Sequence, residues 1–193
     1  MNYLIDYTKL NRENILIDFW GTLAESKLRE KQWKDLFLNF NKDNIETQSF
    51  LKYWKERWFK LEITEEQFKE DIIYAFNLKK DYSEKIFNLI NYKNITLKKG
   101  VLETLSLLKS RNYRIYLVSD CGLDTLKFVN ISKLKDFFSW EFYSFKYKTT
   151  KDENLYKFVK EELGENCVMI GDNQKRDYEI PRRYGFDSIL IKK

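Results

Sequence analysis

The stretch Ile15-Leu-Ile-Asp-Phe-Trp-Gly-Thr-Leu23 decides the fold class of this chain. Its first three residues form an apolar run typical of a short buried strand, and Asp18 follows directly. Gly21 then permits a sharp turn, and Thr22 leads into a polar segment that favours a helix. In α/β proteins the carboxyl end of a parallel strand presents side chains for chemistry in this manner. The stretch therefore predicts that Asp18 lies at such a strand end.

The second half of the chain alternates between helix-like and strand-like segments. Helices are expected near 100–111, 123–130, 152–163 and 178–184, and strands at 115–118, within 138–145, at 167–170 and at 188–191. This alternation predicts a parallel sheet with helices on both faces. The expected fold class is therefore α/β, with a Rossmann-like sheet.

Residues 25–95 contain no convincing strand. Their apolar residues recur at helical spacing, and Thr64-Glu-Glu-Gln67 has the pattern of a capping box at a helix start. The many aromatic side chains are interpreted as the core of a small bundle rather than as a surface that stacks a ligand. The predicted organisation is a core domain of residues 1–24 and 96–193, with a small helical subdomain of residues 25–95 inserted after the first strand.

Composition limits the classes of function. The chain has 193 residues, of which 43% are hydrophobic and 34% charged, and its formal net charge is +5. Because basic and acidic residues are interleaved, as in Lys55-Glu56-Arg57, a nucleic-acid partner is not expected. No apolar run is long enough to cross a membrane, and the N-terminus lacks the pattern of a secretory signal. A cytoplasmic location without membrane association is therefore expected.

The set of reactive side chains is narrow. The sequence contains no histidine, and its two cysteines, Cys121 and Cys167, are not expected to form a disulfide. The absence of histidine excludes Ser-His-Asp and Cys-His nucleophile chemistry and His-ligated zinc. Any catalysis must use carboxylates, lysine, hydroxyls and backbone amides.

Four segments place such groups at the ends of expected strands or just ahead of a helix. They are Asp18-Phe-Trp-Gly-Thr22, Leu117-Val-Ser119-Asp120, the lysines Lys146, Lys148 and Lys151, and Ile170-Gly-Asp172-Asn-Gln-Lys-Arg-Asp177. The carboxyl ends of parallel strands open on one edge of a sheet, so the four segments are expected to meet there.

In order and spacing, these four segments resemble the motifs of the haloacid dehalogenase superfamily of hydrolases, and the resemblance covers nearly the whole chain. It implies a Rossmann-like core with a helical cap after the first strand, which residues 25–95 would supply. It also implies phosphoryl transfer through a covalent aspartyl intermediate, usually with Mg²⁺, from a small phosphorylated metabolite.

The resemblance assigns catalytic roles to two side chains. Asp18 would be the nucleophile, because a carboxylate can attack phosphorus and divide one difficult step into two. A lysine would neutralise the phosphoryl oxygens and orient Asp18. Lys148 is preferred for this role, with Lys151 as the second candidate.

The resemblance also implies a substrate-binding set and a metal-binding set. Ser119 would donate its hydroxyl to a phosphate oxygen, helped by backbone amides of the following turn. The other substrate-binding candidates are Thr22, Asp120 and Lys151. Magnesium, which prefers oxygen ligands, would be held by Asp18, Asp172, Asp177 and the backbone carbonyl of Trp20.

Trp20 leaves three functions open. Many phosphatases of the superfamily carry at this position an aspartate that protonates the leaving group, a role worth roughly 10²–10⁴ in rate. The first alternative is a Mg²⁺-dependent phosphohydrolase for good leaving groups, or one whose acid comes from the substrate or from the cap, such as Glu25. The second is a metal-independent 2-haloacid dehalogenase, since those relatives carry an aromatic residue here. The third is a catalytically weak binding or regulatory protein.

Overall fold

The computed structural model describes residues 10–42 and 45–191, and a five-stranded sheet lies at its centre. The strands are β1 (Asn14–Ile17), β4 (Arg114–Ser119), β5 (Trp140–Tyr143), β6 (Cys167–Gly171) and β7 (Asp187–Leu190). All of their pairings are parallel, in the order β5-β4-β1-β6-β7. The predicted α/β class with a Rossmann-like parallel sheet is therefore confirmed.

Strand β1 lies in the middle of the sheet. It pairs with β4 on one side and with β6 on the other, so that Ile15 is aligned with Ile115 and with Val168. All four residues of β1 are buried. A parallel strand covered on both faces must be apolar along its whole length, which explains the unbroken Ile15-Leu-Ile17 run.

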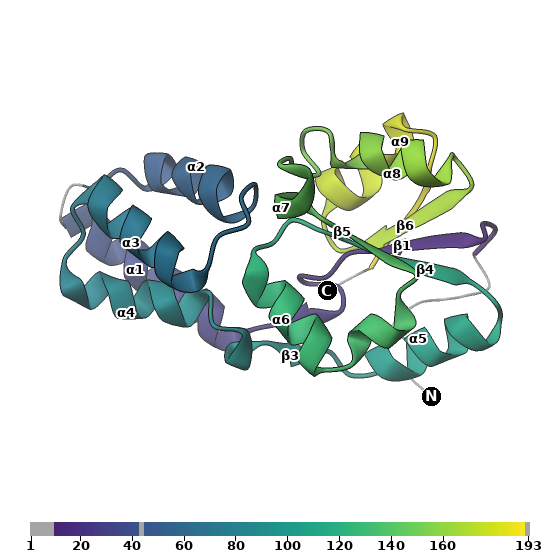
Figure 1. Cartoon of the computed structure of the whole chain (residues 1–193), viewed down its shortest axis with the longest axis horizontal. Coiled ribbons are helices and arrows are strands. Elements are labelled where there is room, and N and C mark those ends of the chain that lie inside the picture. Colours follow the sequence, from purple (N-terminus) through teal and green to yellow (C-terminus); the bar gives the residue numbers. More distant parts are fainter. Residues whose placement is uncertain (1–9, 43–44, 192–193) are drawn as a thin grey trace.

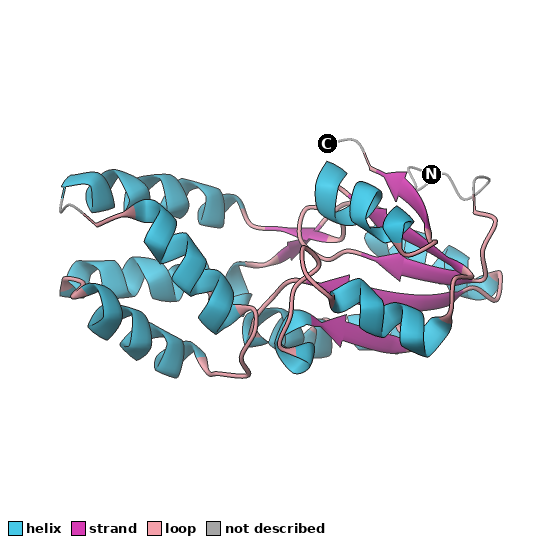
Figure 2. Cartoon of the chain, turned by 90° about the horizontal axis from the view of Figure 1, so that it is seen from above, coloured by secondary structure: helices cyan, strands magenta, loops and turns pink. Residues whose placement is uncertain are grey.

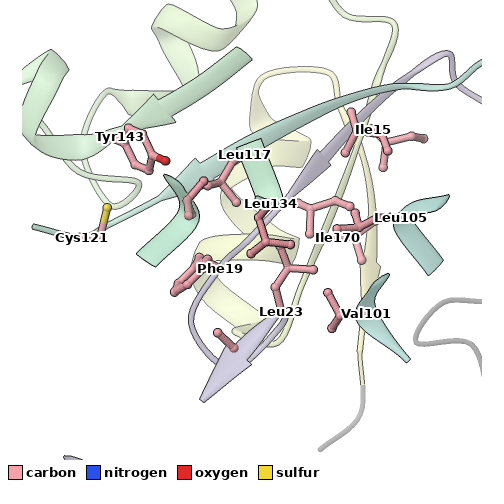
Figure 3. Close-up of a cluster of buried hydrophobic side chains, with 14 of the residues drawn as sticks. Ile15, Phe19, Leu23, Val101, Leu105, Leu117, Cys121, Leu134, Tyr143 and Ile170 are labelled. Atoms are coloured by element: carbon pink, nitrogen blue, oxygen red, sulfur yellow. The ribbon is translucent and has the colours of Figure 1, made fainter. Parts of the chain in front are cut away.

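Helices cover both faces of the sheet, as Figure 1 shows. On one face lie α5 (Val101–Ser110) and α6 (Leu123–Ile131), and on the other lie α8 (Leu155–Leu163) and the short α9 (Ile180–Arg183). Alternate residues of β4 point to the two sides: Leu117 packs with the first pair of helices, and Val118 packs with the second. Figure 3 shows the first of these cores, in which side chains from the central strands meet those of α5.

Four further helices form a separate unit that lies beside the sheet (Figure 2). In the sequence this unit is inserted after β1 and before the other strands of the sheet. They are α1 (Lys27–Lys42), α2 (Thr47–Trp58), α3 (Glu65–Phe76) and α4 (Lys80–Leu89). Their aromatic side chains pack on one another in a core of their own, centred on Phe50, Trp54 and Phe68. At the start of α3, Thr64 and Gln67 form the predicted capping box, with both reciprocal hydrogen bonds present.

Two short strands mark where the chain enters and leaves this helical unit. β2 (Ala24–Glu25) and β3 (Thr96–Leu97) pair antiparallel, with Ala24 opposite Leu97. A 3₁₀ turn, η2 (Tyr92–Asn94), precedes β3. The sequence did not predict this pair, because a strand of two residues is too short to show an alternating pattern.

Side chains also join the helical unit to the core domain. Lys60, just beyond α2, lies 2.8 Å from a carboxylate oxygen of Glu153, and Lys55 of α2 lies 3.3 Å from the same oxygen. Glu65 of α3 pairs with Lys127 of α6. These ion pairs hold the helical unit against two segments of the core domain.

The remaining elements refine the expected boundaries. The 138–145 stretch divides into β5 and a one-turn helix, α7 (Ser144–Tyr147), and another turn, η3 (Leu134–Phe137), precedes β5. The expected 178–184 helix begins earlier, as a π-helical turn, η4 (Gln174–Glu179), that continues into α9. None of the helices in the described part of the chain combines the length and apolar character that crossing a bilayer requires.

Candidate active site

The carboxyl edge of the sheet brings together all four segments singled out from the sequence. Asp18 follows β1, Ser119 ends β4, and Asp172 follows β6. The loop after α7 adds Lys151, which is buried. Because β1 lies between β4 and β6, Asp18 stands in the middle of this edge.

The loop after β1 is shaped so that the Asp18 carboxylate is held in place. The amide nitrogen of Asp18 donates to the carbonyl of Ile170 at 2.9 Å, and the hydroxyl of Thr22 donates to Asp18 Oδ2 at 3.1 Å. Thr22 is fully buried, so the structure places it as a positioning partner of Asp18. Gly21 has a φ of +82°, and a Cβ there would lie 2.2 Å from Asp172 Oδ2. Only glycine lets the loop turn this closely against the second acidic segment.

Lys151, rather than Lys148, reaches the nucleophile candidate. The ammonium group of Lys151 contacts Asp18 Oδ1 and lies 2.7 Å from Asp177 Oδ1, and its side chain is 3% exposed. Lys148 caps the end of α7 in a left-handed conformation, with φ of +52°, and is exposed to solvent. Of the two candidate lysines, Lys151 contacts Asp18 and Lys148, the preferred one, does not, because the chain turns at Lys148 and directs the later lysine inward.

Asp120 holds the lysine loop in position. Its Oδ1 accepts a hydrogen bond from the backbone nitrogen of Lys151 at 2.8 Å, and its Oδ2 lies 3.5 Å from Arg176 Nη1. Both carboxylate oxygens of Asp120, predicted to bind substrate, thus contact protein groups in this structure. The sequence analysis assigned no role to Arg176, although it lies inside the acidic segment after β6.

Three carboxylates lie close enough to share a cation. One oxygen from each of Asp18, Asp172 and Asp177 lies within 4.8 Å of the others. Asp177 is fixed by a hydrogen bond from the backbone nitrogen of Asn173 at 3.0 Å. A Cβ at Gly171 would lie 2.3 Å from Asp177 Cβ, so this glycine makes room for the cluster.

The electrostatics of the cluster fit a divalent cation. Burial raises the pKa of Asp18 to about 7, with Lys151 opposing the shift and the neighbouring Asp177 adding to it. Burial alone would lower the pKa of Lys151, but Asp177 and Asp18 outweigh it and hold that pKa well above its ordinary value. The cluster gathers three carboxyl groups at one point, and oxygen-only ligands are those that Mg²⁺ prefers.

Trp20 faces the core domain rather than offering a proton to the site. Its indole nitrogen donates to Thr125 Oγ1 of α6 at 3.1 Å, and its ring lies edge-on to Phe19 at 5.2 Å between centroids. Glu25, the acid suggested from the cap, is exposed in β2, and its carbonyl accepts a bond from Thr96. The single N–H donor of the Trp20 ring is therefore already used in a hydrogen bond within the protein.

Two further polar side chains lie near this edge, one predicted from the sequence and one not. Ser119, a predicted phosphate ligand, is fully buried, and its hydroxyl has no hydrogen-bond partner among the residues that the structure describes. Lys98, which the sequence analysis did not name, directs its ammonium group to the carbonyl of Gly21. Lys98 follows β3 and is adjacent to Lys99, and no sequence pattern shows which of the two lysines makes this contact.

The fold and the site together define the class of protein. A parallel sheet with acidic groups at the carboxyl ends of its central strands is the arrangement of α/β proteins that bind their ligands at this edge. The model of the haloacid dehalogenase-like hydrolases matches residues 13–185, and the chain belongs to this family. No protein of curated function matches the sequence.

Solved structures share this fold at low sequence identity. A HAD family enzyme from Bacteroides thetaiotaomicron, solved in complex with magnesium and inorganic phosphate, is 22% identical, with a TM-score of 0.68 over 94% of this chain and 95% of that chain. A HAD phosphatase from Thermococcus onnurineus is 17% identical, with a TM-score of 0.64 over 93% of this chain and 86% of the other. A dehalogenase is also 17% identical, with a TM-score of 0.62, and the alignment covers 94% of this chain and 85% of that one.

Proposed function

We propose that this protein is a Mg²⁺-dependent phosphatase that acts through an aspartyl-phosphate on a small phosphorylated metabolite. The observation that carries the proposal is the convergence of three carboxylates and one buried lysine on a single point of the sheet edge. The magnesium and phosphate bound by the Bacteroides thetaiotaomicron relative support the same chemistry.

The residues divide into a nucleophile and its supports. An Asp18 carboxylate oxygen attacks phosphorus, and the bond between phosphorus and the ester oxygen breaks. Thr22 and Lys151 hold the Asp18 carboxylate in orientation, and Lys151 also offsets charge on the phosphoryl oxygens. The unpartnered hydroxyl of Ser119 donates to one of those oxygens. Water then cleaves the acyl phosphate, releasing phosphate and returning Asp18 to a carboxylate.

The metal site in this proposal consists of Asp18, Asp172, Asp177 and the backbone carbonyl of Trp20. When bound, Mg²⁺ supplies positive charge that stabilises the phosphoryl oxygens in the transition state. Asp177 also contacts Lys151, so this metal ligand and the lysine hold each other's side chains in position.

We also propose that residues 25–95 act as the cap and residues 1–24 and 96–193 as the catalytic core. The separate hydrophobic core of α1–α4 supports this division. The cap residues Lys60 and Glu65 reach core segments on either side of the site, so the cap covers the entrance for substrate.

The indole at position 20 restricts the substrates. A leaving group that departs as a stable anion needs no proton, whereas a sugar or alkyl alkoxide does. With Trp20 in place of an acid, we expect faster turnover of aryl phosphates than of alkyl phosphates.

The test is release of p-nitrophenol from p-nitrophenyl phosphate with and without Mg²⁺. We expect a rate that requires Mg²⁺ and that falls to the blank level in Asp18→Asn. A rate that is indifferent to Mg²⁺, or that survives Asp18→Asn, would refute the proposal.

A dehalogenase is the second candidate, and Trp20 is the observation that favours it. Halide leaves without a proton, so dehalogenation does not require an acidic side chain at position 20. Chloride release from chloroacetate in the absence of metal would support this function. The retention of Asp172 and Asp177 beside Asp18 favours the phosphatase.

A further inference from the structure

Arg176 lies at the same edge of the sheet, and the proposed mechanism gives it no role. It belongs to the π-helical turn η4, directly before Asp177, and two side chains fix its backbone. Its amide nitrogen donates to Asn173 Oδ1 at 2.9 Å, and its carbonyl accepts from the hydroxyl of the buried Tyr156 at 2.8 Å. Short π-helical turns are rare and frequently occur at functional sites. The fold therefore fixes the point from which the Arg176 side chain extends.

The guanidinium group of Arg176 reaches across the sheet edge to Asp120. Arg176 follows β6, Asp120 follows β4, and β1 lies between these two strands, as can be followed in Figure 1. Arg176 Nη1 lies 3.5 Å from Asp120 Oδ2, so the pair spans the end of β1, where Asp18 stands. Burial lowers the pKa of Arg176, but nearby carboxylates outweigh burial and raise that pKa, first Asp120 and then Asp18.

Asp120 connects Arg176 to Lys151. The Asp120 side chain is 6% exposed, and Arg176 is the cation paired with it in the part of the chain that the structure describes. The other carboxylate oxygen of Asp120 accepts from the backbone nitrogen of Lys151 at 2.8 Å. The Lys151 ammonium group in turn contacts Asp18. A continuous series of contacts therefore runs from Arg176 through Asp120 and Lys151 to the proposed nucleophile.

Loss of the guanidinium group would leave the buried Asp120 carboxylate without its cation. A buried charge that loses its partner is strongly unfavourable, so the carboxylate would take up a proton or turn toward solvent. Burial already raises the pKa of Asp120, and Lys151 and Arg176 oppose that shift. A protonated carboxyl group accepts a weaker hydrogen bond than a carboxylate, and a rotated one loses the bond. In either case the backbone of Lys151 is held less firmly.

We propose that Arg176 is a positioning residue that holds the Asp120 carboxylate in place, and that Asp120 in turn holds Lys151 against Asp18. This inference rests on the proposed phosphatase function, in which Lys151 offsets charge on the phosphoryl oxygens. An interaction that matters only in the transition state lowers kcat when it is lost and leaves KM nearly unchanged. A guanidinium group that bound the substrate directly would raise KM when removed.

The kinetic test measures kcat and KM for p-nitrophenyl phosphate at saturating Mg²⁺. We expect Arg176→Met to lower kcat by about tenfold to 10²-fold, as for a catalytic group displaced by about 1 Å, and to change KM by less than about twofold. Arg176→Lys keeps a cation near Asp120 and should recover part of the loss. In a Lys151→Met background, Arg176→Met should cause little further loss, because residues that act through one another are not additive.

Lys175→Met is the matched control. It removes one positive charge from the same turn, but Lys175 is exposed and lies 3.6 Å from Asp152 rather than beside Asp120. We expect this variant to change kcat by less than about twofold.

A second measurement tests the same contacts without turnover. The protein is labelled with ¹⁵N at its lysines, and the spectrum of Lys151→Met identifies the Lys151 backbone amide, which bonds to Asp120. We expect Arg176→Met to move this signal upfield and to speed its hydrogen exchange by about tenfold, as for the loss of one hydrogen bond. Arg176→Lys and Lys175→Met should leave the signal close to its place in the parent protein.

The inference is overturned if Arg176→Met raises KM and leaves kcat unchanged, which would show direct contact with substrate. It is also overturned if the losses in Arg176→Met and Lys151→Met multiply in the double variant, or if the Lys151 amide does not respond to Arg176→Met. Failure of the proposed function would look different: the parent protein would not hydrolyse p-nitrophenyl phosphate. The Lys151 amide would still show whether Arg176 holds this loop.

Discussion

A buried ammonium group between two carboxylates sets the charge balance of the site. Lys151 contacts Asp18 and Asp177 with only 3% of its side chain exposed. Removing it leaves like charges facing one another and an unneutralised phosphoryl group. We expect Lys151→Met to lower kcat/KM for p-nitrophenyl phosphate by at least about 10²-fold, the usual cost of losing one transition-state donor.

Lys148→Met is the matched control for that variant. Lys148 is exposed and lies three residues away in the same loop, so kcat/KM should change by less than about twofold. Both variants are measured by steady-state kinetics at saturating Mg²⁺, with circular dichroism to verify folding. A similar loss in both would contradict the assignment of Lys151.

Under the proposed function, the residue at position 20 determines which leaving groups are accepted. Trp20→Asp introduces a proton donor and should raise kcat/KM for an alkyl phosphate more than for an aryl phosphate, because the alkoxide needs the proton. The comparison is the alkyl-to-aryl ratio of kcat/KM, which we expect to rise by at least about tenfold. Trp20→Asn controls for loss of the ring and of its bond to Thr125. The same rise in Trp20→Asn would show that steric relief, not acid catalysis, is responsible.

At the scale of elements, an ion pair joins α2 to the loop before α8. Partial burial raises the pKa of Glu153, but its hydrogen bonds with Lys60 and Lys55 outweigh burial and lower that pKa below its ordinary value. Because the pKa of Glu153 is lower in the folded state, its ion pairs stabilise the fold at pH values above the unfolded pKa of about 4.3. The stabilisation is lost as pH falls through the folded pKa.

We therefore expect Glu153→Gln to lower the free energy of unfolding by about 0.5–1 kcal/mol at pH 7. At about pH 3 the difference between the variant and the parent protein should be smaller than at pH 7, because the stabilisation is lost as pH falls through the lowered pKa of folded Glu153. Urea unfolding at the two pH values measures this difference. Glu161→Gln, on the following helix α8 and 3.8 Å from Lys157, should have a smaller effect. A penalty that stays constant with pH would rule out the ion pair as its cause.

Sequence patterns predicted elements better than they predicted contacts. The apolar runs at 15–17, 115–118 and 167–170 are strands because a buried parallel strand must be apolar on both faces. Which of Lys148 and Lys151 contacts Asp18 depends on the left-handed turn at Lys148. No residue pattern in this segment predicts that turn. Trp58 and Gly122 are far apart in sequence, so their contact depends on how the helical unit lies on the core.

At the scale of the whole molecule, the proposed metal site is formed by loops that follow two neighbouring strands, β1 and β6. Mg²⁺ that binds only the folded chain should stabilise it by about 2.7 kcal/mol at a 100-fold excess over Kd. For a chain of this length the melting temperature should then rise by about 5–10 °C. Addition of EDTA should reverse the rise, as measured by thermal denaturation.

Asp172→Asn should abolish most of that Mg²⁺-dependent rise, because it removes one of the three carboxylates. Asp152→Asn is the matched control, since Asp152 lies beside Lys151 but pairs outward with Lys175 at 3.6 Å. Full retention of the rise in Asp172→Asn would show that Mg²⁺ binds elsewhere on the chain.

The pairing of β2 with β3 has a consequence for how such an enzyme is assembled. Glu25 and Thr96 lie opposite one another, so the chain departs from the core and returns to it at a single point. A two-residue hairpin turn could therefore join β2 directly to β3 in place of α1–α4. Replacing α1–α4 by such a turn should therefore leave the strand order of the parallel sheet unchanged.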